Sequence, residues 1–145
     1  MTKVLFVEDE PWGVDSYFSR LERYDFQCEL AKSLNEAIEK LQHEKFDMLS
    51  LDIMFSRGKS VEEKIEHRSA GLRLLQLIRT GKIGNCDPNL KVIVLTALAS
   101  SQIEQQVRQL GVFAYLTKPI AFNKVIGIFK RSRQQMKIDQ KINPR

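Results

Sequence analysis

Polar residues that could carry out chemistry follow four separate apolar runs of the sequence. In chain order they are Glu8, Asp9 and Glu10, then Asp52, then Thr96, and finally Lys118. Carboxylates that gather in one place repel one another unless a hard cation lies among them, and Mg²⁺ prefers carboxylates together with several waters. A lysine and a hydroxyl beside them would hold an anion. This combination indicates metal-assisted phosphoryl transfer, in which positioning and charge neutralisation do most of the catalysis.

The elements that would position these residues alternate along the chain. Continuous apolar runs, typical of strands buried on both faces, occupy residues 4–7, 48–51, 92–95 and 112–116, and a weaker run at 26–31 suits a strand nearer the edge. Helical spacing of apolar residues fills the intervals at 14–21, 34–41, 71–79, 103–110 and 122–129. Five strand–helix repeats predict an α/β fold, a doubly wound parallel five-stranded sheet with right-handed crossovers. The polar residues above would then meet at its carboxyl edge.

Helix boundaries carry signals of their own. Pro11 suits a first helical position, and Gly111 suits the glycine that ends a helix. Ser33 with Glu36, and Ser101 with Glu104, have the spacing of capping boxes.

Composition indicates one soluble intracellular domain. The chain has 145 residues, of which 43% are hydrophobic and 28% charged, as in ordinary globular domains. No apolar run approaches the ~18–20 residues of a membrane span, and the acidic N-terminal stretch is not that of a signal peptide. We therefore expect a cytoplasmic location. Cys28 and Cys86 are interpreted as reduced thiols, and His43 and His67 as surface residues.

Positive charge is concentrated at the C-terminus. The net charge is +5, yet residues 124–145 carry seven basic residues and one acid, so the rest of the chain sums to −1. This distribution makes a nucleic-acid partner of the chain alone unlikely on electrostatic grounds. We predict a domain over residues 1–131 and a basic helix extension or linker over residues 132–145.

Four stretches, "KVLFVEDE", "FDMLSLDIM", "VIVLTA" and "YLTKPI", together resemble the receiver domain of two-component response regulators. The resemblance covers roughly residues 3 to 131. It implies the flavodoxin-like strand order 2-1-3-4-5, which general accounts of doubly wound sheets give for this group.

The resemblance also implies a role for each acid. Asp52 would be the phosphoacceptor, a carboxylate nucleophile that forms an aspartyl phosphate. Asp9 would bind Mg²⁺ (or Mn²⁺) directly, Glu8 would help through water, and Asp52 and the backbone carbonyl of Met54 would complete the metal site.

The remaining site residues would respond to the phosphoryl group. By similarity Lys118 pairs with its oxygens, Thr96 donates a hydrogen bond to it, and the Tyr115 ring turns inward as part of the same switch. The peptide bond between Lys118 and Pro119 would be cis.

A phosphorylation-controlled switch is the function that follows. A histidine kinase or a phosphotransfer protein would supply the phosphoryl group, and the surface formed by the last two strands and the last helix would change to control a downstream protein. Homodimerisation through that surface is a family habit. The chain would not be an enzyme beyond catalysing its own phosphotransfer and slow autodephosphorylation.

Two alternatives stay open. A pseudo-receiver would act as an interaction module that takes no phosphate, against which the complete set of site residues argues. A phosphatase with an aspartate nucleophile would need a second aspartate two residues after Asp52, where the chain has Met54.

Two departures from ordinary family members stand out. The loop at 55–70 is about ten residues longer than usual. It would gate access to phosphodonors or contact a cognate kinase, and the alternative is a solvated decoration. Met54 and Leu98, the positions that flank the phosphoryl group in the family, are both apolar. Since neither can orient an attacking water, we expect a long-lived aspartyl phosphate.

Overall fold

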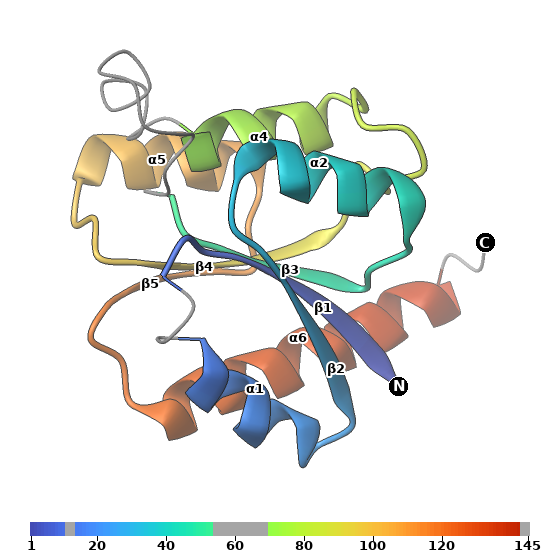
Figure 1. Cartoon of the computed structure of the whole chain (residues 1–145), viewed down its shortest axis with the longest axis vertical. Helices are drawn as coiled ribbons and strands as arrows, with labels where there is room; N and C mark the ends of the chain where they lie inside the picture. The colour runs from blue at the N-terminus through green and yellow to red at the C-terminus, as the bar shows by residue number, and fades with distance from the viewer. Residues whose placement is uncertain (11–13, 54–69, 143–145) are drawn as a thin grey trace.

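The computed structural model describes residues 1–10, 14–53 and 70–142 (Figure 1). Its strands are β1 (Thr2–Val7), β2 (Phe26–Ala31), β3 (Met48–Leu51), β4 (Lys91–Thr96) and β5 (Ala114–Thr117). Its helices are α1 (Asp15–Glu22), α2 (Leu34–His43), α4 (Ala70–Arg79), α5 (Ser101–Leu110) and α6 (Phe122–Ile142). All four strand pairs are parallel, in the order β2-β1-β3-β4-β5, which confirms the predicted fold class and strand order.

The sheet is covered on both faces, by α2, α4 and α5 on one and by α1 and α6 on the other (Figure 1). Because side chains of a strand alternate between faces, β1 serves both cores: Leu5 and Val7 belong to the first, Val4 and Phe6 to the second. The apolar runs are therefore continuous rather than alternating.

Aromatic rings bind α1 and α6 to the second face. The Phe6 ring lies 5.0 Å from that of Phe18 in α1 and 5.7 Å from that of Phe129 in α6, centroid to centroid. Phe129 in turn meets Phe26 of β2 at 6.1 Å. These separations suit favourable ring pairs. The contacts pack α1 and α6 against β1, the strand that directly precedes the acids Glu8, Asp9 and Glu10.

Two sequence predictions need correction. Residues 112–116 were predicted as a strand buried on both faces, but β5 begins at Ala114 and only Tyr115 of it is buried, because β5 is an edge strand. Ser101 was predicted to cap its helix, whereas Ser100 does so, its hydroxyl accepting a hydrogen bond from the backbone N–H of Ile103 at 3.3 Å. A cap needs an extended backbone, which Ser100 has and the helical Ser101 lacks.

Other boundary predictions are confirmed. The Ser33 hydroxyl accepts a hydrogen bond from the Glu36 N–H at 3.2 Å, and Gly111 ends α5 with a φ of 95°. Ala70, counted in the extended loop, is the first residue of α4. Pro11 and residues 55–69 of that loop lie outside the described residues.

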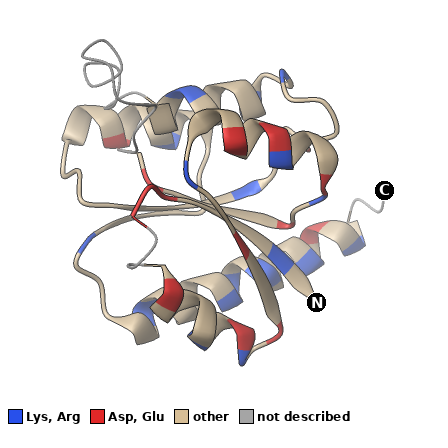
Figure 2. Cartoon of the chain, in the orientation of Figure 1, with Lys and Arg blue, Asp and Glu red and all other residues tan. Residues whose placement is uncertain are grey.

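The last helix, α6, continues past Arg131 to Ile142 as one unbroken element. It is tied back to the sheet by an ion pair between Asp139 and Lys91 of β4 at 2.8 Å. Arg133 donates a hydrogen bond to the Tyr24 carbonyl at 2.6 Å. Figure 2 shows basic residues recurring along this helix. Among the described helices, none is both long and apolar enough to cross a membrane.

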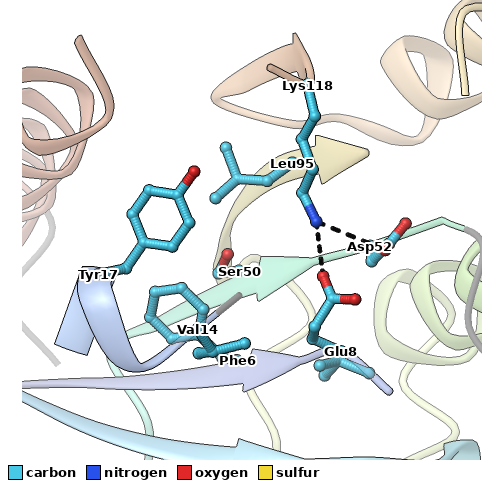
Figure 3. A pocket seen from close by; sticks show the side chains of 9 residues that line it. Phe6, Glu8, Val14, Tyr17, Ser50, Asp52, Leu95 and Lys118 are labelled. Carbon is cyan, nitrogen blue, oxygen red and sulfur yellow. Dashed lines mark hydrogen bonds and ion pairs between the residues drawn. The ribbon is translucent and has the colours of Figure 1, made fainter. Parts of the chain in front are cut away.

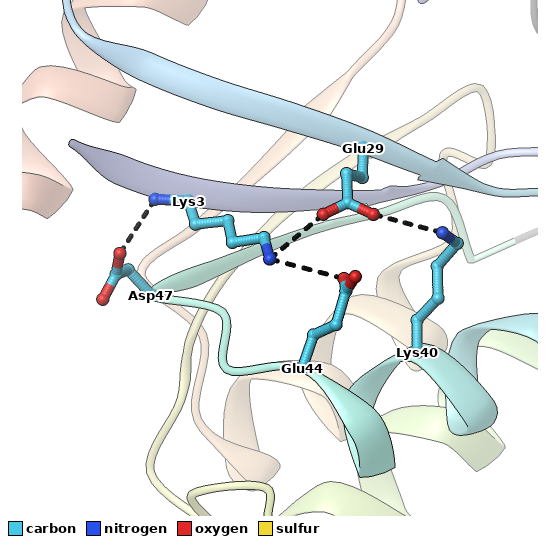
Figure 4. A network of polar contacts seen from close by, with 5 residues as sticks. All are labelled: Lys3, Glu29, Lys40, Glu44 and Asp47. Carbon is cyan, nitrogen blue, oxygen red and sulfur yellow. Dashed lines mark hydrogen bonds and ion pairs between the residues drawn. The ribbon is translucent and has the colours of Figure 1, made fainter.

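A network of charges closes the end of the sheet opposite the carboxyl edge (Figure 4). Lys3 Nζ of β1 lies 3.2 Å from Glu29 of β2 and 3.4 Å from Glu44, which ends α2. Lys40 of α2 pairs with the other oxygen of Glu29 at 3.2 Å. The Lys3 N–H donates to the Asp47 carboxylate at 2.8 Å. The network thereby joins two strands, a helix and the start of β3.

We predict that Lys3→Gln lowers the free energy of unfolding by about 1 kcal/mol, because it leaves two partly buried carboxylates without their shared cation. Urea denaturation at low and high salt measures this loss, which should shrink in 1 M NaCl. Arg108→Gln is the control, since the Arg108–Glu104 pair is exposed and within one helix. Equal losses for the two variants would contradict the prediction.

Candidate functional site

The carboxyl ends of three strands bring Glu8, Asp52 and Lys118 together. Each residue is fixed by a backbone hydrogen bond just beyond its strand: Glu8 N–H to Ala31 O at 3.0 Å, Asp52 N–H to Val7 O at 3.0 Å, and Lys118 N–H to Thr96 O at 2.8 Å. Sheet pairing therefore sets the positions from which these side chains project.

Lys118 bridges the two carboxylates (Figure 3). Its Nζ lies 2.7 Å from Glu8 Oε2 and 3.8 Å from Asp52 Oδ2. Glu8 and Asp52 are each only 8% exposed. A buried carboxylate needs a charged partner to stay ionised, and this single ammonium serves two. Asp52 is thus held beside a cation that could also bind the oxygens of an anion.

Burial and neighbouring charges shift the pKa values of both Glu8 and Lys118. Burial raises the pKa of Glu8, the hydrogen bond from Lys118 lowers it and the charge of Asp52 raises it again, leaving it at about 7. Burial lowers the pKa of Lys118, but its hydrogen bond with Glu8 and the charges of Glu8 and Asp52 together raise it above the ordinary value. Lys118 therefore stays protonated, while the raised pKa of Glu8 favours a bound proton on its carboxylate.

Thr96 is the last residue of β4 and Tyr115 the second residue of β5, and the two are linked through one residue, Leu98. The Thr96 hydroxyl accepts a hydrogen bond from the Leu98 N–H at 3.2 Å, and the Tyr115 hydroxyl donates one to the Leu98 carbonyl at 2.8 Å. Thr96 is fully buried and Tyr115 is 7% exposed, so the tyrosine ring already points inward. Next to this pair, the Lys118–Pro119 peptide bond is cis.

A divalent cation is the group that the resemblance assigns to the acids of the site. Among residues 1–10, 14–53 and 70–142, no three acidic, cysteine or histidine side chains lie close enough to form a preassembled metal site. The donors nevertheless fit Mg²⁺, because Glu8 and Asp52 are buried carboxylates at one edge of the sheet and carboxylate oxygens are the ligands that this hard cation prefers. Asp9 follows Glu8 directly and is half-buried. Met54 lies outside the described residues.

Some residues beside the site carried no predicted role. A small pocket adjoins the Lys118 side chain, and it is lined by Phe6, Val7, Glu8, Val14, Tyr17, Ser50, Asp52, Leu95 and Lys118 (Figure 3). Ser50 could have been noticed as the polar residue inside the apolar run 48–51. Tyr17 could not, because its spacing is simply that of an apolar helix face.

Comparison with known proteins identifies the class. The family model described as "Response regulator receiver domain" matches residues 4–130. The chain therefore belongs to the response regulator receiver domain family, the phosphorylation-dependent signalling modules of two-component systems.

Individual relatives agree with this assignment. The response regulator protein PilR of Pseudomonas aeruginosa is 28% identical over 123 residues, which cover 85% of this chain but only 24% of that protein. The chain thus spans about a quarter of the length of that relative.

Solved structures show the same fold. A CheY-like response regulator receiver domain protein from Methanospirillum hungatei matches with a TM-score of 0.78 at 22% identity, covering 96% of this chain and 98% of that one. A response regulator from Burkholderia pseudomallei, solved with a phosphorylated aspartic acid, a calcium ion and citrate, matches with a TM-score of 0.68 at 20% identity. The match covers 99% of this chain and 76% of that one.

The pKa of Glu8 predicts a pH-dependent stability in the absence of divalent cations. The folded chain keeps a proton on Glu8 up to about pH 7, whereas the unfolded chain releases it near its ordinary pKa of ~4.3. The stabilisation is therefore complete at low pH and is lost as pH rises through 7. Between pH 5 and 8, wild type should lose on the order of 1–3 kcal/mol more than Glu8→Gln.

Urea denaturation of both proteins in a chelating buffer measures that difference. Glu10→Gln is the control, because Glu10 is exposed and should follow wild type. Parallel pH profiles for wild type and Glu8→Gln would show the prediction to be wrong.

Proposed function

We propose that the chain is a phosphorylation-controlled signalling switch that accepts a phosphoryl group on Asp52 in a Mg²⁺-dependent reaction. The observation that carries this proposal is the placement of Asp52, 8% exposed and 3.8 Å from Lys118 Nζ, at the carboxyl edge of a receiver sheet. The donor would be the phosphohistidine of a histidine kinase or of a phosphotransfer protein. The phosphorylated aspartic acid of the Burkholderia pseudomallei regulator is support by analogy.

In the proposed step an Asp52 carboxylate oxygen attacks phosphorus and forms a P–O bond. The P–N bond of the donor breaks, and the released imidazole nitrogen takes up a proton. Lys118 would move from Glu8 toward the transferred phosphoryl oxygens, where a charge-assisted hydrogen bond is strong.

Glu8, Asp9, Asp52 and the backbone carbonyl of Met54 are the groups that would hold the cation. Mg²⁺, or Mn²⁺ in its place, would neutralise the charge that develops on the phosphoryl oxygens. Burial and the charge of Asp52 raise the pKa of Glu8, and a cation bound beside it would lower that pKa again and favour the carboxylate.

Thr96 and Tyr115 are proposed to read the phosphoryl group. The Thr96 hydroxyl accepts from Leu98 N–H and keeps its own proton to donate. The phosphoryl group brings about −1.5 to −2 charge at pH 7, and a switch from about 1:99 to 99:1 requires roughly 5.5 kcal/mol of differential stabilisation. Several charge-assisted hydrogen bonds could supply it, altering the β4–β5–α6 surface that would meet a downstream protein or a second copy of the chain.

The alternative is a pseudo-receiver, which binds partners without taking phosphate. One experiment separates the two. The protein is incubated with Mg²⁺ and acetyl phosphate and then weighed intact. We expect one phosphate adduct in wild type, none in Asp52→Asn, and a normal adduct in Asp15→Asn, whose carboxylate is exposed. A folded wild type that takes no adduct would establish the pseudo-receiver instead.

The aspartyl phosphate should be long-lived, because Met54 and Leu98, which correspond to the positions that flank the phosphoryl group in the family, are apolar and cannot orient an attacking water. Leu98→Asn should shorten its half-life about tenfold or more by orienting a water, whereas Leu98→Met should leave it unchanged. Intact mass after removal of acetyl phosphate follows the decay. A wild-type half-life of seconds would refute this expectation.

A further inference from the structure

The start of α4 lies directly on the backbone that carries Asp52. A Cβ atom added to Gly71 would lie 2.5 Å from Ile53 Cα, 2.7 Å from the Asp52 carbonyl oxygen and 2.8 Å from the Ile53 carbonyl oxygen. The Gly71 N–H donates a hydrogen bond to Ile53 O at 3.1 Å. All three close atoms belong to the backbone, so no side chain could turn aside to make room.

The surroundings cannot yield easily either. Ile53 and Ala70 are both fully buried, and the Asp52 N–H donates a hydrogen bond to the Val7 carbonyl of the neighbouring strand. The Asp52–Ile53 backbone is therefore held by hydrogen bonds to both β1 and α4. Since carbon atoms in contact prefer about 3.5–4.0 Å, a methyl group on Gly71 would displace this backbone by roughly 1 Å.

Gly71 differs in this respect from the other described glycines. A Cβ on Gly84 or Gly127 would meet nothing within 4 Å. Gly81 and Gly111 have positive φ angles of 69° and 95°, and their nearest neighbours are side-chain atoms at 3.8 Å. Turn geometry accounts for that second pair, whereas Gly71 is required by the approach of a helix to the phosphoacceptor backbone.

We propose that Gly71 is a positioning residue for phosphotransfer: its missing side chain lets α4 seat the Asp52 backbone at the place from which the carboxylate meets Lys118 and Glu8. This inference rests on the proposed function, because it assumes that Asp52 is the nucleophile. In-line attack requires close alignment of the reacting atoms, and a misplacement of 1 Å costs about 100-fold in rate.

The test is the rate at which Gly71→Ala takes up phosphate from acetyl phosphate, followed by intact mass across a range of donor and Mg²⁺ concentrations. We expect the limiting rate to fall about 10- to 100-fold. The limiting rate is taken at saturating Mg²⁺, because Asp52 and Met54, two of the four groups proposed to hold the cation, follow β3 as well. In metal-free protein, the largest amide NMR shift changes should fall on Val7, Asp52 and Ile53.

Two kinds of control separate positioning from loss of stability. Gly84→Ala and Gly127→Ala introduce the same methyl group in open space and should react like wild type. Leu74→Ala removes buried contacts from the same helix and should be destabilised, yet at a temperature where it is fully folded it should keep the wild-type limiting rate.

Each result of these measurements either supports or overturns the role of Gly71. A selectively slow Gly71→Ala supports the inference. Wild-type rates in Gly71→Ala, or equal slowing in Leu74→Ala, would overturn it, and so would a Gly71→Ala protein that stays unfolded in Mg²⁺ and sucrose, because the residue would then serve folding in general. Failure of wild type itself to accept phosphate would instead refute the proposed function.

Discussion

The carboxyl edge of the sheet depends on the pairing of one half-buried ammonium, that of Lys118, with two buried carboxylates. Glu8 follows β1, Asp52 follows β3 and Lys118 follows β5, so the contact exists only if the sheet has the order β2-β1-β3-β4-β5 and the lysine reaches past β4. Burial of ionised groups costs free energy unless partners are present. The stability of this edge therefore depends on these three side chains.

The backbone supplies the precision that long side chains lack. Each charged residue of the site is bonded to the neighbouring strand just where its own strand ends. Beneath β1 lies a layer of aromatic rings around Phe6, and against Asp52 lies α4, brought close by Gly71. The backbone of Asp52 is thus supported from the strand beside it and from the helix above it.

The route from the site to the rest of the molecule is short. Thr96 and Tyr115 share the peptide groups of Leu98, so a movement of the threonine hydroxyl alters the bonding of the residue that holds the tyrosine. Tyr115 belongs to the edge strand β5, which leaves one side of this pair close to the molecular surface. The long α6 runs under the same sheet and is tied to β4 through Asp139 and Lys91.

Local patterns along the chain were enough to predict the strands, the helices and the edge of the sheet at which the polar residues meet. Apolar runs ending in Glu8, Asp52, Thr96 and Lys118 could be recognised because strand burial and strand ends leave local patterns. The sequence also predicted Ser33 and Gly111 as helix boundaries, since caps depend on a few neighbouring residues. It misplaced the cap at Ser101 and the burial of residues 112–116, because backbone angle at a helix start and position at a sheet edge are not encoded in the apolar pattern.

Which charges pair, and which residues hold them in place, could be seen only in the folded chain. That Lys118 bridges Glu8 and Asp52, that Leu98 joins Thr96 to Tyr115, and that Gly71 presses on Ile53 all involve residues far apart in the chain. Side-chain periodicity reports which face of an element is buried. It carries no information about the distance between two elements, and that distance decides both the pKa of Glu8 and the need for glycine at residue 71.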